Sequence, residues 1–109
     1  MIARRSIVAT VLALLLLGGA ALAQATPIVT IDDGPSKQTK NRKARFAFSS
    51  DDPAATFECR LDEVDFAPCL SPTIYRSLER GRHSFQVRAI SVEGALSAPA
   101  SQKWKIAKR

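Results

Sequence analysis

The sequence contains few of the residues that usually carry out catalysis. Its 109 residues include one histidine, one tryptophan, one tyrosine and two cysteines. A metal site would need more ligands than these residues supply, and no nucleophile motif accompanies His83. A chain of this length has room for one small domain, which excludes a two-domain enzyme with a cleft between its domains. We therefore expect no enzymatic activity, no metal and no cofactor.

Acidic residues are missing from the first 31 positions, where the only cations are Arg4 and Arg5. An apolar run follows over 7–17, and small residues in Ala-x-Ala spacing end at Ala25. This order is typical of a signal peptide, so we predict one over 1–25, with cleavage after Ala25. The alternative is an uncleaved membrane anchor, although the apolar run is shorter than the roughly 20 residues that a span needs.

Export would place Cys59 and Cys69 in an oxidising compartment. Two cysteines in a small exported domain usually form a disulfide, whereas a catalytic thiol pair is more often spaced Cys-x-x-Cys. Closing a loop of about ten residues contributes roughly 2–3 kcal/mol to stability. We predict a structural disulfide between Cys59 and Cys69, in a protein that is secreted or held at the cell envelope.

Short segments with alternating apolar and polar residues fill the rest of the chain. They lie at 45–49, 56–62, 84–89 and 103–106, and 27–31 reads as an opening strand. Alternation with a period of two is typical of strands with one buried face, and turn residues separate the segments. No helical periodicity is present beyond residue 25. We predict an all-β domain over 26–107, an antiparallel β-sandwich of six or seven strands, with a polar loop over 36–43.

Three pieces of sequence, taken in order, resemble a bacterial immunoglobulin-like module found in secreted and surface proteins. They are Phe-x-Cys-x-Leu-Asp at 57–62, Phe-x-Pro-Cys at 66–69 and His-x-Phe-x-Val-Arg-Ala at 83–89. The resemblance covers about 28–106 and implies an immunoglobulin-like or fibronectin type III-like sandwich in an extracellular setting. It implies no catalytic residues, because the motif of the module contains none. The chain departs from the pattern after Asp62, where the module usually has a glycine in the turn.

The strands at 56–62, 84–90 and 102–107 lie side by side in one sheet of an immunoglobulin-like sandwich. Four cations are then among their outward residues, and neighbouring cations on one face attract polyanions. The alternative is a solvated face that keeps the protein soluble. Outward aromatic residues, which would indicate binding to single-stranded nucleic acid, are absent, so nucleic acid is not an expected partner. The candidate polyanion-binding residues are Arg60, Arg88, Lys103 and Lys105.

Two further residues have structural interpretations. His83 follows a turn and points to the same face as Phe85, so we expect it to be partly buried and bonded to backbone. Trp104 alternates with two lysines, which predicts a core position. The paired acidic residues lie near turns, where aspartate is common, and none matches a calcium-loop spacing.

Two functions remain open from the sequence. The first is a secreted, non-enzymatic module for binding or spacing at the cell surface, with an envelope polyanion as partner. The second is a small secreted effector or inhibitor that binds an extracellular protein through the disulfide-closed loop, which is ordered before binding. Salt distinguishes the two functions, because polyanion binding weakens steeply with salt, whereas docking of an apolar loop does not. Membrane contact is expected only through an uncleaved N-terminal segment. The candidate loop residues are Glu63, Val64, Asp65 and Phe66.

Overall fold

The computed structural model describes residues 25–108, and within them the chain forms eight β-strands and no helix. The predicted signal peptide lies outside the described residues, except for Ala25. No helix among the described residues is long and apolar enough to cross a membrane. The strands are β1 (Val29–Asp33), β2 (Gln38–Thr39), β3 (Ala44–Ser50), β4 (Thr56–Leu61), β5 (Ala67–Cys69), β6 (Thr73–Tyr75), β7 (Gly81–Ile90) and β8 (Ala100–Ile106).

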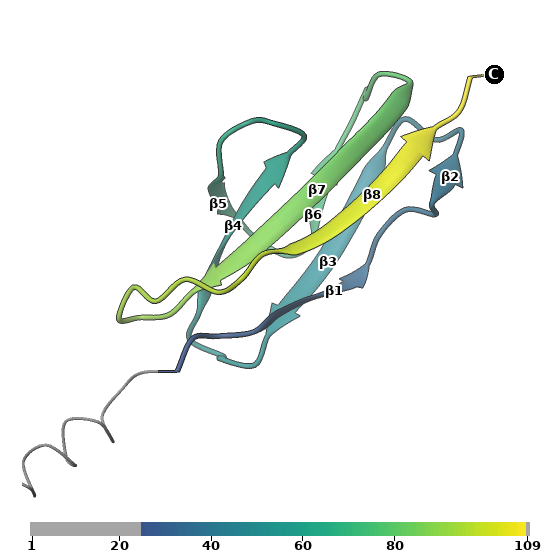
Figure 1. Cartoon of the computed structure of the whole chain (residues 1–109). Coiled ribbons are helices and arrows are strands. Elements are labelled where there is room, and N and C mark those ends of the chain that lie inside the picture. Colours follow the sequence, from purple (N-terminus) through teal and green to yellow (C-terminus); the bar gives the residue numbers. More distant parts are fainter. Residues whose placement is uncertain (1–24, 109) are drawn as a thin grey trace, which may run out of the picture.

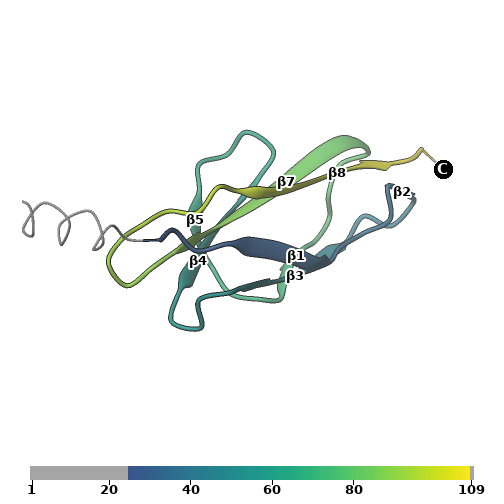
Figure 2. The same ribbon diagram turned by 60° about the horizontal axis from the view of Figure 1, so that its bottom comes forward.

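The strands form two sheets that face each other as the layers of a sandwich (Figures 1 and 2). One sheet has the order β1-β3-β6 and the other has the order β2-β8-β7-β4-β5. Neighbouring strands are antiparallel, except that β2 pairs with β8 in parallel. The all-β sandwich predicted from the sequence is therefore confirmed, with one parallel pair that the prediction did not contain.

The longer strands follow the predicted alternation, whereas the shorter ones depart from it. Along β4 and β7, residues that face the core alternate with residues that face outward, because successive side chains of a strand point to opposite faces. The strand β7 begins at Gly81, three residues before the predicted start. The stretch 36–43, predicted as a loop, contains β2, which brings the total to eight strands instead of six or seven.

Aromatic rings from both sheets meet in the core. Phe46 of β3 stacks on Phe85 of β7, with ring centroids 3.9 Å apart. Trp104 of β8 meets the edge of Phe46 at 5.3 Å, and Tyr75 of β6 meets it at 6.2 Å. The predicted core position of Trp104 is confirmed, since the residue is 3% exposed. Each such ring pair adds about 0.5–1.5 kcal/mol to the stabilisation from apolar burial.

The predicted disulfide joins Cys59 of β4 to Cys69 of β5. Between these two strands, Phe57 is opposite Cys69 and Cys59 is opposite Ala67. The disulfide therefore reinforces a short edge strand whose pairing with β4 covers only three residues. It also closes the connection over 62–66, whose position matters for the outer face of the sheet.

The N-terminal and C-terminal ends of the described chain lie at opposite ends of the sandwich (Figure 1). The connections over 51–55 and 91–99 lie at the N-terminal end, because β3 and β7 both run toward it. The connections over 62–66 and 76–80 lie toward the C-terminal end. Each end of the sandwich is therefore made by its own set of loops.

Candidate functional site

The five-stranded sheet places β4, β7 and β8 side by side, as the sequence predicted. Their outward residues form rows across the sheet. Glu58 is opposite Arg88, and Arg60 is opposite Gln86. Further toward the C-terminal end, Ser84 is opposite Lys103, and Arg82 is opposite Lys105. The four predicted cations do share one face, but their surroundings divide them into two groups.

In the first group, Arg60 and Arg88 are already bound to other residues of the chain. The ring of Phe66 folds from the β4–β5 connection onto the sheet, with its centroid 4.8 Å from Cζ of Arg60 and 4.1 Å from Cζ of Arg88. Arg88 also donates from Nε and Nη2 to Oε1 of Glu58, at 2.9 and 2.7 Å. Arg60 donates from Nε to Oε1 of Gln86. These contacts fix the side chains and partly neutralise Arg88.

The second group, here called the basic cluster, consists of Lys37, Arg82, Lys103 and Lys105. These exposed cations surround a shallow hollow of about 170 Å³, which His83 and Trp104 also line. Among the described residues, none of the four side chains has a hydrogen bond or an ion pair. Cations two residues apart on a strand are separated by about 6.6 Å, and adjacent strands by about 4.8 Å. The cluster therefore presents several positive charges within a small area, none of them in an ion pair among the described residues.

Sequence reasoning did not identify Arg82 and Lys37 as members of this cluster. Arg82 was missed because β7 was expected to begin at Ser84, although the outward alternation of Ser84, Gln86 and Arg88 continues back to Arg82. No local signal could have placed Lys37. It precedes β2, whose pairing with β8 brings residues 37–39 beside Lys105.

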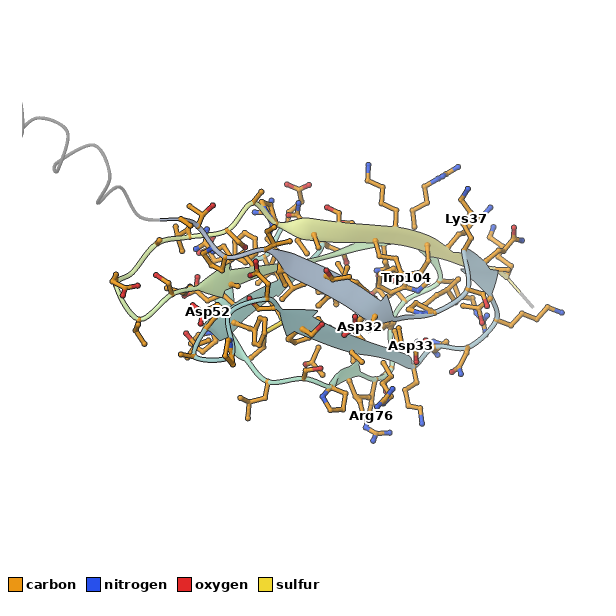
Figure 3. The ribbon with its side chains drawn as sticks, turned by 90° about the horizontal axis from the view of Figure 1, so that it is seen from below. Asp32, Asp33, Lys37, Asp52, Arg76 and Trp104 are labelled. Carbon is orange, nitrogen blue, oxygen red and sulfur yellow. A yellow bond between two sulfur atoms is a disulfide. The ribbon has the colours of Figure 1, made fainter. Side chains whose placement is uncertain are left out.

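The two ends of the sandwich differ in their charged residues, because the connections at the N-terminal end have only acidic ones, whereas the C-terminal end combines the basic cluster with Asp62, Glu63, Asp65 and Glu79. The connections at the N-terminal end, 51–55 and 91–99, contain Asp51, Asp52 and Glu93 and neither lysine nor arginine. Lys37 and Asp52 lie at opposite ends in Figure 3. The basic cluster is at the C-terminal end, because Arg82 is near the start of β7 and Lys105 is near the end of β8. The basic cluster is thus at the opposite end of the sandwich from the acidic connections that precede β4 and β8.

His83 links three segments beside the basic cluster. Its Nδ1 lies 2.9 Å from Oδ2 of Asp62, and its Nε2 lies 2.6 Å from the carbonyl oxygen of Glu79. Asp62 is fixed in turn, because its Oδ1 accepts a hydrogen bond from the backbone nitrogen of Ser84 at 2.9 Å. The predicted burial of His83 and its bond to backbone are confirmed, with a side chain that is 10% exposed. The contact with Asp62, 21 residues away, was not predicted.

Asp62 also explains how the chain turns without the glycine that the resemblance led us to expect. Its φ is 57°, in the left-handed region that aspartate tolerates better than most residues. Its backbone nitrogen donates to the carbonyl oxygen of Ser84 at 2.7 Å, so its backbone and its side chain together continue the β4–β7 pairing. The residue that terminates β4 is therefore the same one that holds His83.

The contacts of His83 favour its protonated form. Burial of the ring is the largest single influence and lowers its pKa. The Glu79 carbonyl and the Asp62 carboxylate act in the opposite direction, and together they raise the pKa of His83 above its ordinary value of 6.5. The pKa of His83 is therefore higher in the folded chain than in the unfolded chain.

We expect the free energy of unfolding to depend on pH through His83. Because the pKa is higher in the folded chain, the stabilisation is complete below the unfolded value of about 6.5 and is lost as the pH rises through the folded value. Urea denaturation at a series of pH values measures this decline. His83→Gln should remove most of it, since glutamine does not titrate. An equal decline in both proteins would show that another group is responsible.

The candidate binding loop is only partly free to make contacts. Glu63, Val64 and Asp65 are exposed, and Val64 retains 66% of its accessible surface. Phe66 is half-buried against Arg60 and Arg88. The loop therefore offers two carboxylates and one valine, while its aromatic ring contributes to the sheet. No group of three or more potential metal ligands occurs among residues 25–108.

Comparison with known proteins adds no relative from which a function could be transferred. No protein-family model and no curated protein sequence matches the chain. Function is therefore inferred from the charged side chains on the five-stranded sheet.

Proposed function

We propose that this chain is a secreted, non-enzymatic module that binds a polyanion of the cell envelope through the basic cluster. The observation that carries the proposal is the set of four exposed cations around one hollow, none of which is paired within the described residues. Such cations attract a polyanion and release its counterions when they bind it. Arg60 and Arg88 act differently, since their contacts with Phe66 and Glu58 support the face beside the cluster.

The order of the strands supports an immunoglobulin-like module. In the five-stranded sheet, β8, β7, β4 and β5 follow the order G, F, C and C′ of a variable-type immunoglobulin sheet. In the other sheet β3 lies between β1 and β6, as strand B lies between strands A and E. The disulfide supports a secreted or envelope location, since such bonds persist in oxidising compartments.

The loop alternative receives less support from the contacts. An inhibitor loop usually presents an aromatic or arginine anchor to its target. Here Phe66 packs against two guanidinium groups of the same sheet, and the exposed tip carries Glu63, Val64 and Asp65. Binding of a protein by this tip would require the ring to leave both arginines or would rely on a single valine.

The test is retention of the purified, oxidised protein on isolated cell envelopes of the producing organism, across a salt series. We expect retention at low salt that disappears at moderate salt. Replacing Arg82, Lys103 and Lys105 with serine should abolish retention. On a purified phosphate polymer, the same changes should reduce the salt slope of log K by about 0.7 for each phosphate that the protein no longer neutralises.

A matched control distinguishes binding through the basic cluster from attraction by the net positive charge of the whole protein. Replacing Lys40, Lys43 and Arg76 with serine removes the same number of exposed cations outside the cluster. This control should retain most of the binding. Equal losses in the two triple variants would mean that only overall charge matters. A wild-type protein that is not retained even at low salt would overturn the proposal.

A further inference from the structure

His83 lies directly beside the basic cluster. It follows Arg82 in β7 and is opposite Trp104, the residue between Lys103 and Lys105. With the cations it lines two hollows, one of about 170 Å³ and one of about 390 Å³. A change in the charge or position of His83 therefore acts on the cluster at close range.

Both ring nitrogens of His83 face oxygens that can only accept hydrogen bonds. These are the Asp62 carboxylate at Nδ1 and the Glu79 carbonyl at Nε2. A neutral imidazole has one N–H group, so it can donate to one of these oxygens and must turn a lone pair toward the other. Only the imidazolium donates to both. The positions of the two oxygens therefore fit the protonated ring.

Loss of the proton breaks the contact with Glu79 rather than the contact with Asp62. The carboxylate of Asp62 is fixed by the backbone of Ser84, so the remaining hydrogen stays on Nδ1 and continues to donate to it. The lone pair of Nε2 then faces the carbonyl oxygen of Glu79 and repels it. As a result, the backbone at Glu79 is no longer bonded to β7.

Glu79 lies between two residues that are held by other contacts, because the backbone nitrogen of Leu78 donates to the carbonyl oxygen of Arg42 at 2.9 Å and Gly81 pairs with Ile106. Gly81 has φ of 119°, and a Cβ added there would meet no atom within 4 Å. Arg80, which lies between Glu79 and Gly81, is held by one hydrogen bond from Nη1 to the carbonyl oxygen of Ala107. Release of Glu79 therefore removes the contact of this connection with the His83 ring, three residues before Arg82 of the basic cluster.

We propose that protonation of His83 controls how tightly the basic cluster binds a polyanion, and that the protonated form binds more tightly. The inference rests on the proposed function. The protonated ring adds a positive charge beside the cluster, and its bond to Glu79 holds the backbone that positions Arg82. Both effects favour a bound anion, and both disappear when the ring becomes neutral.

The charged groups around His83 make this coupling reciprocal. The carboxylates of Asp62 and Glu79 favour the proton. A polyanion bound at the basic cluster adds negative charge beside the ring and so also favours the proton, by the same factor by which the proton tightens binding. The charged side chains that line the hollows beside the ring are Lys37, Asp62, Glu63, Arg82, Lys103 and Lys105.

The experiment uses long-chain polyphosphate as the probe, because it is a polyanion without other functional groups. Its affinity for the oxidised protein is measured from about pH 5.5 to about pH 8.5, which spans the titration of histidine. We expect a fall of about fivefold or more, the lower end of ordinary coupling between sites. NMR of His83, the sole histidine of the chain, should then show that polyphosphate raises its pKa by about 0.7, the logarithm of the same factor.

Asp62→Asn is the decisive variant, because it lets the neutral ring keep both contacts. The asparagine oxygen still accepts from Ser84, and its amide donates to Nδ1, so that the hydrogen on Nε2 donates to Glu79. We expect tight binding at both ends of the pH range. His83→Gln, which cannot titrate, should also bind without the histidine-dependent fall. The pH dependence that remains in His83→Gln measures the contribution from titration of polyphosphate and of the N-terminal amine.

The outcomes separate this inference from the proposed function. Absence of polyphosphate binding at every pH, with envelope retention also absent, would overturn both. Binding that falls with pH by the same factor in the wild type and in both variants would overturn the inference and leave the proposed function intact. An unchanged pKa of His83 in the presence of bound polyphosphate would also overturn the inference and leave the proposed function intact.

Discussion

Replacing Phe85 with alanine is expected to leave the domain largely unfolded. The ring is fully buried, stacks on Phe46 at 3.9 Å and lies 6.0 Å from Tyr75. Truncation of a buried phenylalanine costs about 3–5 kcal/mol, because the surrounding side chains cannot fill the cavity. Small domains have a free energy of unfolding of only about 5 kcal/mol at the low end. A single change in the centre of the core therefore removes most of the stability.

Urea denaturation, supported by the dispersion of NMR amide signals, measures this effect. Val64→Ala is a suitable control, since this exposed side chain should change the free energy of unfolding by no more than about 0.5 kcal/mol. A Phe85→Ala protein whose denaturation midpoint remained close to that of the wild type would contradict the described core.

Removal of the disulfide is the second large effect that we expect. The bond joins Cys59 and Cys69, which are separated by 10 positions in the sequence, and the chain-entropy relation assigns about 2–3 kcal/mol to such a loop. For a domain of this size, the melting temperature falls by about 4–8 °C for each kcal/mol, so a reduction of about 10–20 °C is expected. Reduction would also release β5 and with it the loop that carries Phe66.

Thermal unfolding followed by circular dichroism, with and without a reducing agent, tests this prediction. The variant in which both cysteines are alanine should melt near the temperature of the reduced wild type and should not respond to the reducing agent. Equal melting temperatures for the oxidised and reduced wild type would show that the bond contributes little.

The sequence was sufficient to predict the parts of the fold that depend on local alternation. Segments such as 56–62 and 84–89 have enough residues for a period of two to be visible, and they correspond to β4 and β7. Strands of two or three residues have no period, so β2, β5 and β6 could not be distinguished from loops. The parallel pairing of β2 with β8 joins segments far apart in the sequence, so it depends on how the two sheets assemble and not on a local pattern.

The candidate site was predictable in composition but not in arrangement. Alternation correctly placed Arg60, Arg88, Lys103 and Lys105 on one outer face. It could not show that Phe66 returns to cover two of these cations, because that contact depends on the path of a disulfide-closed loop. The contact between His83 and Asp62 has a similar origin, since it joins the start of one strand to the turn that ends another.

The separation of charge between the two ends of the sandwich has a consequence for motion in solution. The N-terminal end has only acidic loops, while at the other end the basic cluster with Arg76 and Arg80 outnumbers Asp62, Glu63, Asp65 and Glu79, so the described residues have an electric dipole along the sandwich. In the field of an anionic surface, this dipole experiences a torque that turns the basic end forward before contact. The N-terminal end then points away from the surface. It lies about 33 Å from the basic end, if the ten residues of β7 are taken as the length of the sandwich. Encounters would therefore begin in one orientation, and screening by salt would remove this preference first.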